Sequence, residues 1–208
     1  MNRKIYDTLG FSMTWFAVIT QLVLMVQNRQ ADVLETIIRF FSFFTILTNI
    51  LVALYFSVRV FNCQNRLLLF LNKIGSITAI TVFILLVGIV YQIVLRSIWK
   101  PEGLQKFVDE LLHTIIPLFV LIYWFIFSKR EDSNFSIFKK WLIYPFSYFI
   151  FIIIRGTFSG FYPYPFVDAS VLESQQIAVN FILITLFVLF LFVILVFISQ
   201  KTKSKTQP

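Results

Sequence analysis

Residues 173–199 read ESQQIAVNFILITLFVLFLFVILVFIS, and no charged residue follows Glu173 in this stretch. An α-helix rises about 1.5 Å per residue, so about 20 apolar residues cross the roughly 30 Å of hydrocarbon in a bilayer. Further segments of the chain have the same character. We expect six membrane-spanning helices, at residues 9–26, 36–60, 67–95, 107–127, 141–158 and 173–199.

The composition indicates an integral membrane protein and excludes a soluble fold. Of the 208 residues, 59% are hydrophobic and only 13% are charged, about half the charged share of soluble domains. The sequence therefore predicts an all-α fold with one bundle of six transmembrane helices over residues 1–200 and a disordered basic tail over 201–208. The first span is expected to be retained, because no small-residue cleavage pattern precedes Gln27.

Membrane topology accounts for the net charge of +8. Cytoplasmic loops of membrane proteins carry an excess of Lys and Arg. With the N-terminus inside, twelve of the 18 basic residues fall on the cytoplasmic side and seven of the ten acidic residues fall outside. We therefore expect both termini in the cytoplasm and no nucleic-acid partner. The twelve basic residues are Arg3, Lys4, Arg59, Arg66, Lys73, Lys129, Arg130, Lys139, Lys140, Lys201, Lys203 and Lys205.

The supply of metal-binding side chains is small. Cys63 is the sole cysteine and His113 the sole histidine, so an internal disulfide and a structural zinc site are both excluded. Asp109 and Glu110 precede His113 and could in principle hold a metal with it. Acidic residues at a helix entrance are more often solvated charges that favour the helix N-terminus. We predict no metal site and no cofactor.

The second span carries polar residues on one helix face. Ser42, Thr45 and Asn49 recur at spacings of three and four residues, with Thr48 beside them. Polar side chains inside a membrane usually face the bundle interior or a cavity, which makes them candidates for function. The alternative is that the hydroxyls bond to carbonyls of the preceding turn and allow close helix packing.

The fourth span carries Asp109, His113 and Pro117 at steps of four residues, so they lie on one face. Pro117 has no N–H for the carbonyl of His113, so a kink and a polar notch are expected there. Burial disfavours the charged imidazole, which suits His113 to act as a general base unless Asp109 offsets the effect. The alternative is a histidine that simply bonds to a neighbouring helix.

Residue counts place a third polar residue at a similar depth. Thr45 lies about 15 Å and His113 about 10 Å below the outer face, and Arg155 lies within roughly 10 Å of it. An intramembrane arginine needs a carboxylate, carbonyls, water or an acidic substrate group. A structural arginine that extends toward the interface is an equal alternative. The carboxylates that we expect as partners are Asp109, Glu110 and Asp168.

Residues 156–166 read GTFSGFYPYPF, which is too rich in Gly and Pro for a continuing helix. We expect an aromatic loop at the outer interface. Such a loop could cap a cavity, although an interfacial aromatic belt is the common explanation.

Two short segments resemble a known family. Residues 44–49, FTILTN, and residues 113–119, HTIIPLF, together resemble the androgen-induced and androgen-dependent family of multi-span membrane hydrolases. Characterised animal members cleave fatty acid esters of hydroxy fatty acids with an intramembrane threonine and histidine, without a cofactor. The resemblance implies Thr45 as nucleophile and His113 as base, with Thr48 as a competing nucleophile. The loop at 162–166 looks like a bacterial six-span branch rather than the animal enzymes.

Two classes of function follow from these residues. The leading hypothesis is an intramembrane lipid ester hydrolase in which Thr45 attacks the ester, His113 takes its proton, and Asn49 and Arg155 contact the substrate. The rival is a small transporter, channel or lipid-binding protein that uses the same polar layer. The expected partners are membrane lipids and a lipid ester, in a multi-pass protein of the bacterial plasma membrane. The sequence does not indicate an oligomeric state.

Overall fold

The computed structural model describes residues 2–63, 65 and 68–202. Within these residues every regular element is helical, and six helical segments are long and apolar enough to cross a membrane. They are Arg3–Gln27, Phe44–Phe61, Ser76–Leu95, Gly103–Phe127, Phe135–Ser159 and Ser174–Thr202. The predicted all-helical membrane bundle is therefore confirmed. The predicted tail and the basic residues Arg66, Lys203 and Lys205 lie outside the described residues, apart from Lys201 and Thr202, which end the last helix.

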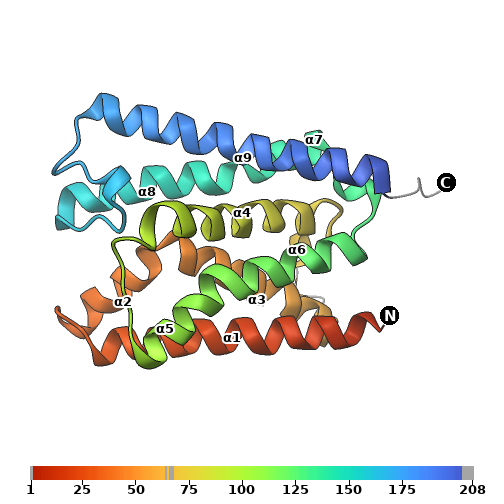
Figure 1. Ribbon diagram of the computed structural model, residues 1–208, viewed down its shortest axis with the longest axis horizontal. Coiled ribbons are helices and arrows are strands. Elements are labelled where there is room, and N and C mark those ends of the chain that lie inside the picture. The colour runs from red at the N-terminus through yellow and green to blue at the C-terminus, as the bar shows by residue number, and fades with distance from the viewer. Residues whose placement is uncertain (1, 64, 66–67, 203–208) are drawn as a thin grey trace.

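Helix α4 (Ser76–Val90) lies at the centre of the bundle. It packs against α3 (Phe44–Phe61), α6 (Ile116–Phe127) and α9 (Ser174–Thr202), and most of its residues are buried. Helix α1 (Arg3–Gln27) packs against α3 and α6 on the opposite side from α9 (Figure 1). A helix that is apolar all round is expected in such a central position, because every face meets protein.

The two ends of the helical bundle differ in what they carry. The start of α1 and the end of α9 lie at the same end (Figure 1). The opposite end carries α2 (Val33–Ser42), α5 (Gly103–Glu110) and the loop between α8 (Ile143–Ser159) and α9. A short helix, α7 (Phe135–Trp141), precedes α8. The candidate polar residues at 45 and 113 therefore belong to the half of the bundle remote from the termini.

A partly buried charged network joins α1, α3 and α6 near the terminal end. The Asp7 carboxylate accepts hydrogen bonds from Arg59 Nε at 3.0 Å and from the Tyr123 hydroxyl at 2.5 Å, and Arg3 Nε donates to that hydroxyl at 3.0 Å. Charges inside a membrane protein need such partners. The network links three helices far from the candidate site.

The expectation of one continuous helix over residues 36–60 is wrong. Helix α2 ends at Ser42, Phe43 is extended with φ −83° and ψ 124°, and α3 begins at Phe44. Residues 41–44 contain neither Gly nor Pro, so the usual local signals of a helix break are absent. The break puts Thr45 in the first turn of a new helix.

Two tyrosines from distant parts of the chain satisfy the backbone groups that this break leaves free. The Tyr148 hydroxyl donates to the Ser42 carbonyl at 2.8 Å, and the Tyr164 hydroxyl accepts from the Thr45 N–H at 3.2 Å. Unsatisfied backbone groups are very costly inside a bilayer. Tertiary contacts rather than local sequence therefore stabilise the separation of α2 from α3.

The fourth span changes its helical register around the histidine. Leu111–Ile115 form a π-helical turn between α5 and α6. The carbonyl of His113 was expected to lie open because of Pro117. It packs closely against Gly88 of α4 instead: a Cβ atom added to Gly88 would lie only 3.0 Å from the carbonyl oxygen. In π spacing the residue five before Pro117 is Leu112, and its carbonyl accepts from Asn49 Nδ2 at 3.4 Å. The carbonyl that accepts a hydrogen bond from a neighbouring helix is therefore that of Leu112, one residue before His113, where it was expected.

The expectation of a loop from residue 156 is wrong for its first four residues, because α8 continues to Ser159 before Gly160 ends it with φ +67°. The predicted aromatic loop follows, with a short 3₁₀ turn at Pro165–Val167. The loop folds back onto the end of α8 and places the Tyr162 ring against Gly156. Only glycine fits there, since a Cβ atom at position 156 would lie 2.0 Å from the ring. This return path carries Tyr164 to the start of α3.

Candidate active site

The hydroxyl of Thr45 is not bonded within its own helix. Thr14 and Thr81, by comparison, each donate to the carbonyl four residues earlier at 2.7 Å. The hydrogen-bond partner of Thr45 Oγ1 is the Tyr164 hydroxyl, at the long distance of 3.4 Å. The position of Thr45 at the start of α3 thus leaves its hydroxyl available for chemistry.

The other hydroxyls of the predicted polar face are committed elsewhere. Ser42 donates to the carbonyl of Ile38 at 2.7 Å, the local bond that the structural alternative predicted. Thr48 is fully buried, and its hydroxyl pairs with the Tyr144 hydroxyl at 2.9 Å. Among the hydroxyl residues of this face, Thr45 is the one that lines the two cavities described below.

His113 is held in one orientation by two contacts. Its Nδ1 lies 3.0 Å from the Asp109 carbonyl oxygen and 3.3 Å from Asp109 Oδ1. Its ring stacks on Tyr91 with centroids 4.0 Å apart. A carbonyl oxygen can only accept, so Nδ1 carries a proton, and in the neutral form of the ring Nε2 is the acceptor. This tautomer is the one that a general base requires.

Asp109 is a buried carboxylate beside this imidazole. It is 5% exposed, and within the described residues its Oδ2 atom has no hydrogen-bond partner. The position of Asp109 on the Nδ1 side of the histidine suits it to orient the ring.

A cavity of about 490 Å³ brings Thr45, Asp109 and His113 together. We call it the polar cavity, because several uncharged polar and charged side chains also line it. This volume falls within the range of small-molecule sites. Among the described residues no direct hydrogen bond joins Thr45 to His113, although both face this space. The other polar side chains that line it are Gln21, Asn28, Arg29, Gln30, Thr36, Arg39, Tyr91, Gln105 and Tyr164.

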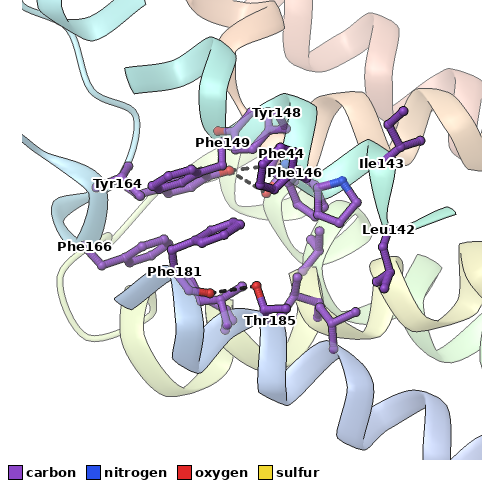
Figure 2. A pocket seen from close by; sticks show the side chains of 18 of the residues that line it. Phe44, Leu142, Ile143, Phe146, Tyr148, Phe149, Tyr164, Phe166, Phe181 and Thr185 are labelled. Carbon is purple, nitrogen blue, oxygen red and sulfur yellow. Dashed lines mark hydrogen bonds between the residues drawn. The ribbon is translucent and has the colours of Figure 1, made fainter. Parts of the chain in front are cut away.

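A second cavity of about 470 Å³, the apolar cavity, lies between α4, α8, α9 and the start of α3. Tyr164 and Phe166 border one end of it, and Leu142 and Ile143 border the other (Figure 2). Most of its lining is aliphatic or aromatic. Thr45 and Tyr164 line both cavities. The threonine therefore lies where the apolar cavity meets a second space that is also mostly apolar but carries more polar side chains.

Asn49, predicted to contact substrate, is fully buried between helices and lines neither cavity. Its Nδ2 donates to the Thr45 carbonyl at 2.9 Å and to the Leu112 carbonyl at 3.4 Å. The amide thereby connects the first turn of α3 to the π-helical turn of His113. Asn49 therefore links the helix that carries Thr45 to the turn that carries His113. Its predicted contact with substrate stays a prediction.

Arg155 lies in an ion-paired cluster at the end of the bundle opposite the termini. Its Nη2 donates to Glu35 at 2.8 Å, its Nη1 donates to the Phe161 carbonyl at 3.1 Å, and its guanidinium lies 4.8 Å from the Phe161 ring. Glu35 also accepts from Arg39 at 2.8 Å. The prediction that Arg155 pairs with Asp109, Glu110 or Asp168 is therefore wrong, because its carboxylate partner is Glu35 of α2. Arg155 is not among the residues that line either cavity, and its predicted substrate contact stays a prediction.

The same cluster changes the acidity of Glu35. The hydrogen bond from Arg39, together with the charge of Arg155, lowers the pKa of Glu35 below its usual 4.5, although partial burial acts in the opposite direction. The carboxylate is therefore ionised at neutral pH and holds α2 against α8 and the loop.

Sequence reasoning did not identify Tyr164. Its loop was expected to be a possible cap, but no local pattern shows that one of its aromatic residues turns inward. The only available signal was the placement of Tyr164 between Pro163 and Pro165, which restrict the backbone on both sides.

Within the described residues, no group of three His, Cys, Asp or Glu side chains lies close enough to hold a metal ion.

Comparisons with protein-family models, with curated proteins and with solved structures found no match to this chain. The resemblance to the androgen-induced and androgen-dependent hydrolases therefore stays a prediction. The fold and the geometry of the two cavities carry the argument that follows.

Proposed function

We propose that this protein is an intramembrane hydrolase of long-chain lipid esters, with Thr45 as nucleophile, His113 as general base and Asp109 as the group that orients the histidine. One observation supports this most directly. Thr45 and His113 line the same polar cavity, while Thr45 also lines the apolar cavity. A hydroxyl with no short bond, a neutral imidazole and a hydrocarbon-lined space are what acyl transfer from a lipid requires.

In the first half of the reaction, Thr45 Oγ1 attacks the ester carbonyl carbon and His113 Nε2 takes the hydroxyl proton. The carbonyl oxygen becomes an oxyanion. When this intermediate collapses, the bond to the alcohol oxygen breaks, and the imidazolium returns its proton to that oxygen. An acyl-threonine and a free alcohol result. Catalytic hydrogen bonds are often long in the free enzyme and shorten when substrate binds, so the lack of a direct Thr45–His113 bond is compatible with this role.

In the second half, water takes the place of the alcohol. His113 accepts a proton from the water as its oxygen attacks the acyl carbon, and the proton passes to Thr45 Oγ1 as the acyl bond breaks. The products are a free fatty acid and the restored threonine. This water would come from the polar cavity, whose lining includes the side chains of Gln21 and Gln105.

The shapes and linings of the two cavities support a lipid ester as the substrate. An acyl chain fits the apolar cavity, whose lining includes Phe149, Phe181 and Val188. The ester then reaches Thr45 at the junction, and the alcohol part extends into the polar cavity. Fatty acid esters of hydroxy fatty acids are the class that the sequence resemblance suggests.

The test is hydrolysis of long-chain fluorogenic esters and of fatty acid esters of hydroxy fatty acids by the detergent-purified protein. Thr45→Ala should lower kcat by roughly 10³-fold or more, and His113→Ala by about 10²–10⁴-fold. Thr45→Ser keeps a hydroxyl and should retain turnover. Thr48→Ala is the matched control, because Thr48 lies one turn further along α3 and pairs with Tyr144.

The rival assignment is a lipid-binding or transport protein that holds a lipid in the apolar cavity without cleaving it. A folded wild-type protein that binds these esters but releases no acid would support the rival. Equal turnover by wild type and Thr45→Ala would also contradict the proposed nucleophile.

A further inference from the structure

Tyr164 reaches Thr45 from the loop between α8 and α9. The ring is 8% exposed, stacks on Phe166 with centroids 5.1 Å apart, and meets the edge of Phe43 with centroids 5.9 Å apart. Asn180 on α9 donates to the Phe166 carbonyl at 2.9 Å and so ties this part of the loop to the bundle. The phenol is therefore held in place before any ligand arrives.

The hydrogen bonds of this hydroxyl differ from those of two half-buried tyrosines nearby. The Tyr144 hydroxyl lies 2.9 Å from Thr48 Oγ1, and the Tyr148 hydroxyl donates to the Ser42 carbonyl at 2.8 Å. The Tyr164 hydroxyl accepts from the Thr45 N–H at 3.2 Å, and its nearest acceptor in the described residues is Thr45 Oγ1 at 3.4 Å. Strong O–H···O bonds are about 2.5–3.0 Å long. The Tyr164 proton thus has only a distant acceptor.

From this geometry we propose that Tyr164 is a catalytic residue, which donates its O–H to the oxyanion that forms when Thr45 attacks an ester. The Thr45 N–H is the second donor: the helix break at Phe43 leaves it without an acceptor in its own helix, and the oxyanion would replace the Tyr164 hydroxyl as its acceptor. The two donors lie 3.2 Å apart, so one oxygen can lie about 3 Å from both, which is the distance that oxyanion stabilisation needs. This inference rests on the proposed ester hydrolysis.

Two further properties fit this role. Burial raises the pKa of Tyr164, so the phenol keeps its proton at neutral pH and can donate it. Tyr164 also lines both cavities, as Thr45 does. An ester carbonyl that arrives at the junction would therefore meet the hydroxyl and the nucleophile together.

The test compares Tyr164→Phe with Tyr144→Phe. Both changes delete a tyrosine hydroxyl that lies beside a threonine of α3, but Tyr144 is not among the residues that line either cavity. We expect Tyr164→Phe to lower kcat by about 10²–10³-fold with little change in KM, and Tyr144→Phe to leave kcat within a few-fold of wild type. A long-chain trifluoromethyl ketone, which forms an oxyanion on Thr45, should bind Tyr164→Phe more weakly by the same factor as the loss in kcat/KM.

The outcomes separate this inference from the proposed function. Normal kcat and normal ketone affinity in Tyr164→Phe, with Thr45→Ala inactive, would overturn the role of Tyr164 and leave the hydrolase standing. No turnover by the wild type would overturn both. If the phenylalanine variant does not fold, 3-fluorotyrosine at position 164 keeps the ring and hydroxyl but changes the acidity of the donor. A changed kcat at constant KM would then support the donor role, and an unchanged kcat would overturn it.

Discussion

The hydroxyl of Thr45 lacks the bond to a carbonyl of the preceding turn that Thr14 and Thr81 make, and the reason lies in the backbone of one residue. Phe43 adopts an extended conformation, so Thr45 begins a helix and its hydroxyl does not bond within that helix. Thr81, within α4, donates to the carbonyl of Ile77. The chemistry proposed for Thr45 therefore depends on a local backbone conformation as much as on the residue type.

Asp109 provides a test at the residue scale. Asp109→Asn keeps the shape of the side chain but removes the charge beside Nδ1 and adds an N–H that can favour the wrong imidazole tautomer. We expect kcat for ester hydrolysis to fall by about 10²–10⁴-fold with KM little changed. Glu110→Gln is the matched control, because Glu110 pairs with Arg96 and Thr114 and is not among the cavity-lining residues. Equal effects of the two substitutions on kcat would contradict the role of Asp109.

Single residues were predictable from the sequence only in part. Thr45 and His113 could be selected because polar side chains are rare in such apolar spans and because residue counts placed both at a similar depth. The partner of Arg155 could not be predicted, since Glu35 lies 120 positions away and just before the expected span at 36–60, whereas the structure places it on α2. Tyr164 was missed for the same reason: its contact with Thr45 depends on the path of a loop.

At the scale of elements, α2 and the loop after α8 are held together by charge. Glu35 accepts hydrogen bonds from Arg39 and Arg155, and both guanidinium groups lie over the Phe161 ring. This cluster lies beside the polar cavity, which Arg39 and Phe161 line. Phe161 contacts both guanidinium groups, so we expect its position in the lining of the polar cavity to depend on the charge of Glu35.

The sign of the resulting pH dependence follows from the lowered pKa of Glu35. A carboxyl group with a lower pKa in the folded state stabilises the fold above its unfolded pKa of about 4.5 and loses that contribution as pH falls through the folded value. Wild type should therefore have a higher Tm than Glu35→Gln at pH 7, and the difference should vanish on acidification below 4.5. Thermal unfolding of the purified protein from pH 7 to pH 3 measures this.

Glu173→Gln is the control for that measurement, because Glu173 is exposed at the start of α9. Its Tm should stay close to that of wild type across the same pH range. A Tm difference between wild type and Glu35→Gln that persists unchanged at pH 3 would show that the carboxylate charge is not what holds α2 to the loop.

The elements differ in how far sequence could predict them. Long apolar runs predict the spans well, because length and hydropathy alone decide whether a helix can cross a bilayer. The break at Phe43 and the π-helical turn at Leu111–Ile115 were not predictable, because tertiary hydrogen bonds from Tyr148, Tyr164 and Asn49 satisfy the backbone groups there. Pro117 indicated a disturbance near His113 but not its register.

For the whole molecule, the start of α1 and the end of α9 lie at one end of the bundle (Figure 1). We propose, from the excess of basic residues at that end, that it faces the cytoplasm. The proposed active site then opens near the outer side of the membrane. An ester could enter it from the outer leaflet.

The sole cysteine makes this topology testable. In a Cys63→Ser background, a cysteine is introduced by Ala169→Cys in the loop between α8 and α9, or by Ser136→Cys in α7; both positions are exposed. A membrane-impermeant maleimide should label the Ala169→Cys protein in intact cells and the Ser136→Cys protein only after the membrane is opened. The reverse pattern would contradict the proposed orientation.

The most direct test of the central claim is to trap the acyl-enzyme. The wild-type protein is mixed with a long-chain ester, quenched in acid within the first turnovers, digested and mapped by mass spectrometry. The account predicts an added acyl mass on Thr45 in wild type and in Thr48→Ala, and no adduct in Thr45→Ala. An acyl group on another residue, or ester cleavage that continues in Thr45→Ala, would contradict it.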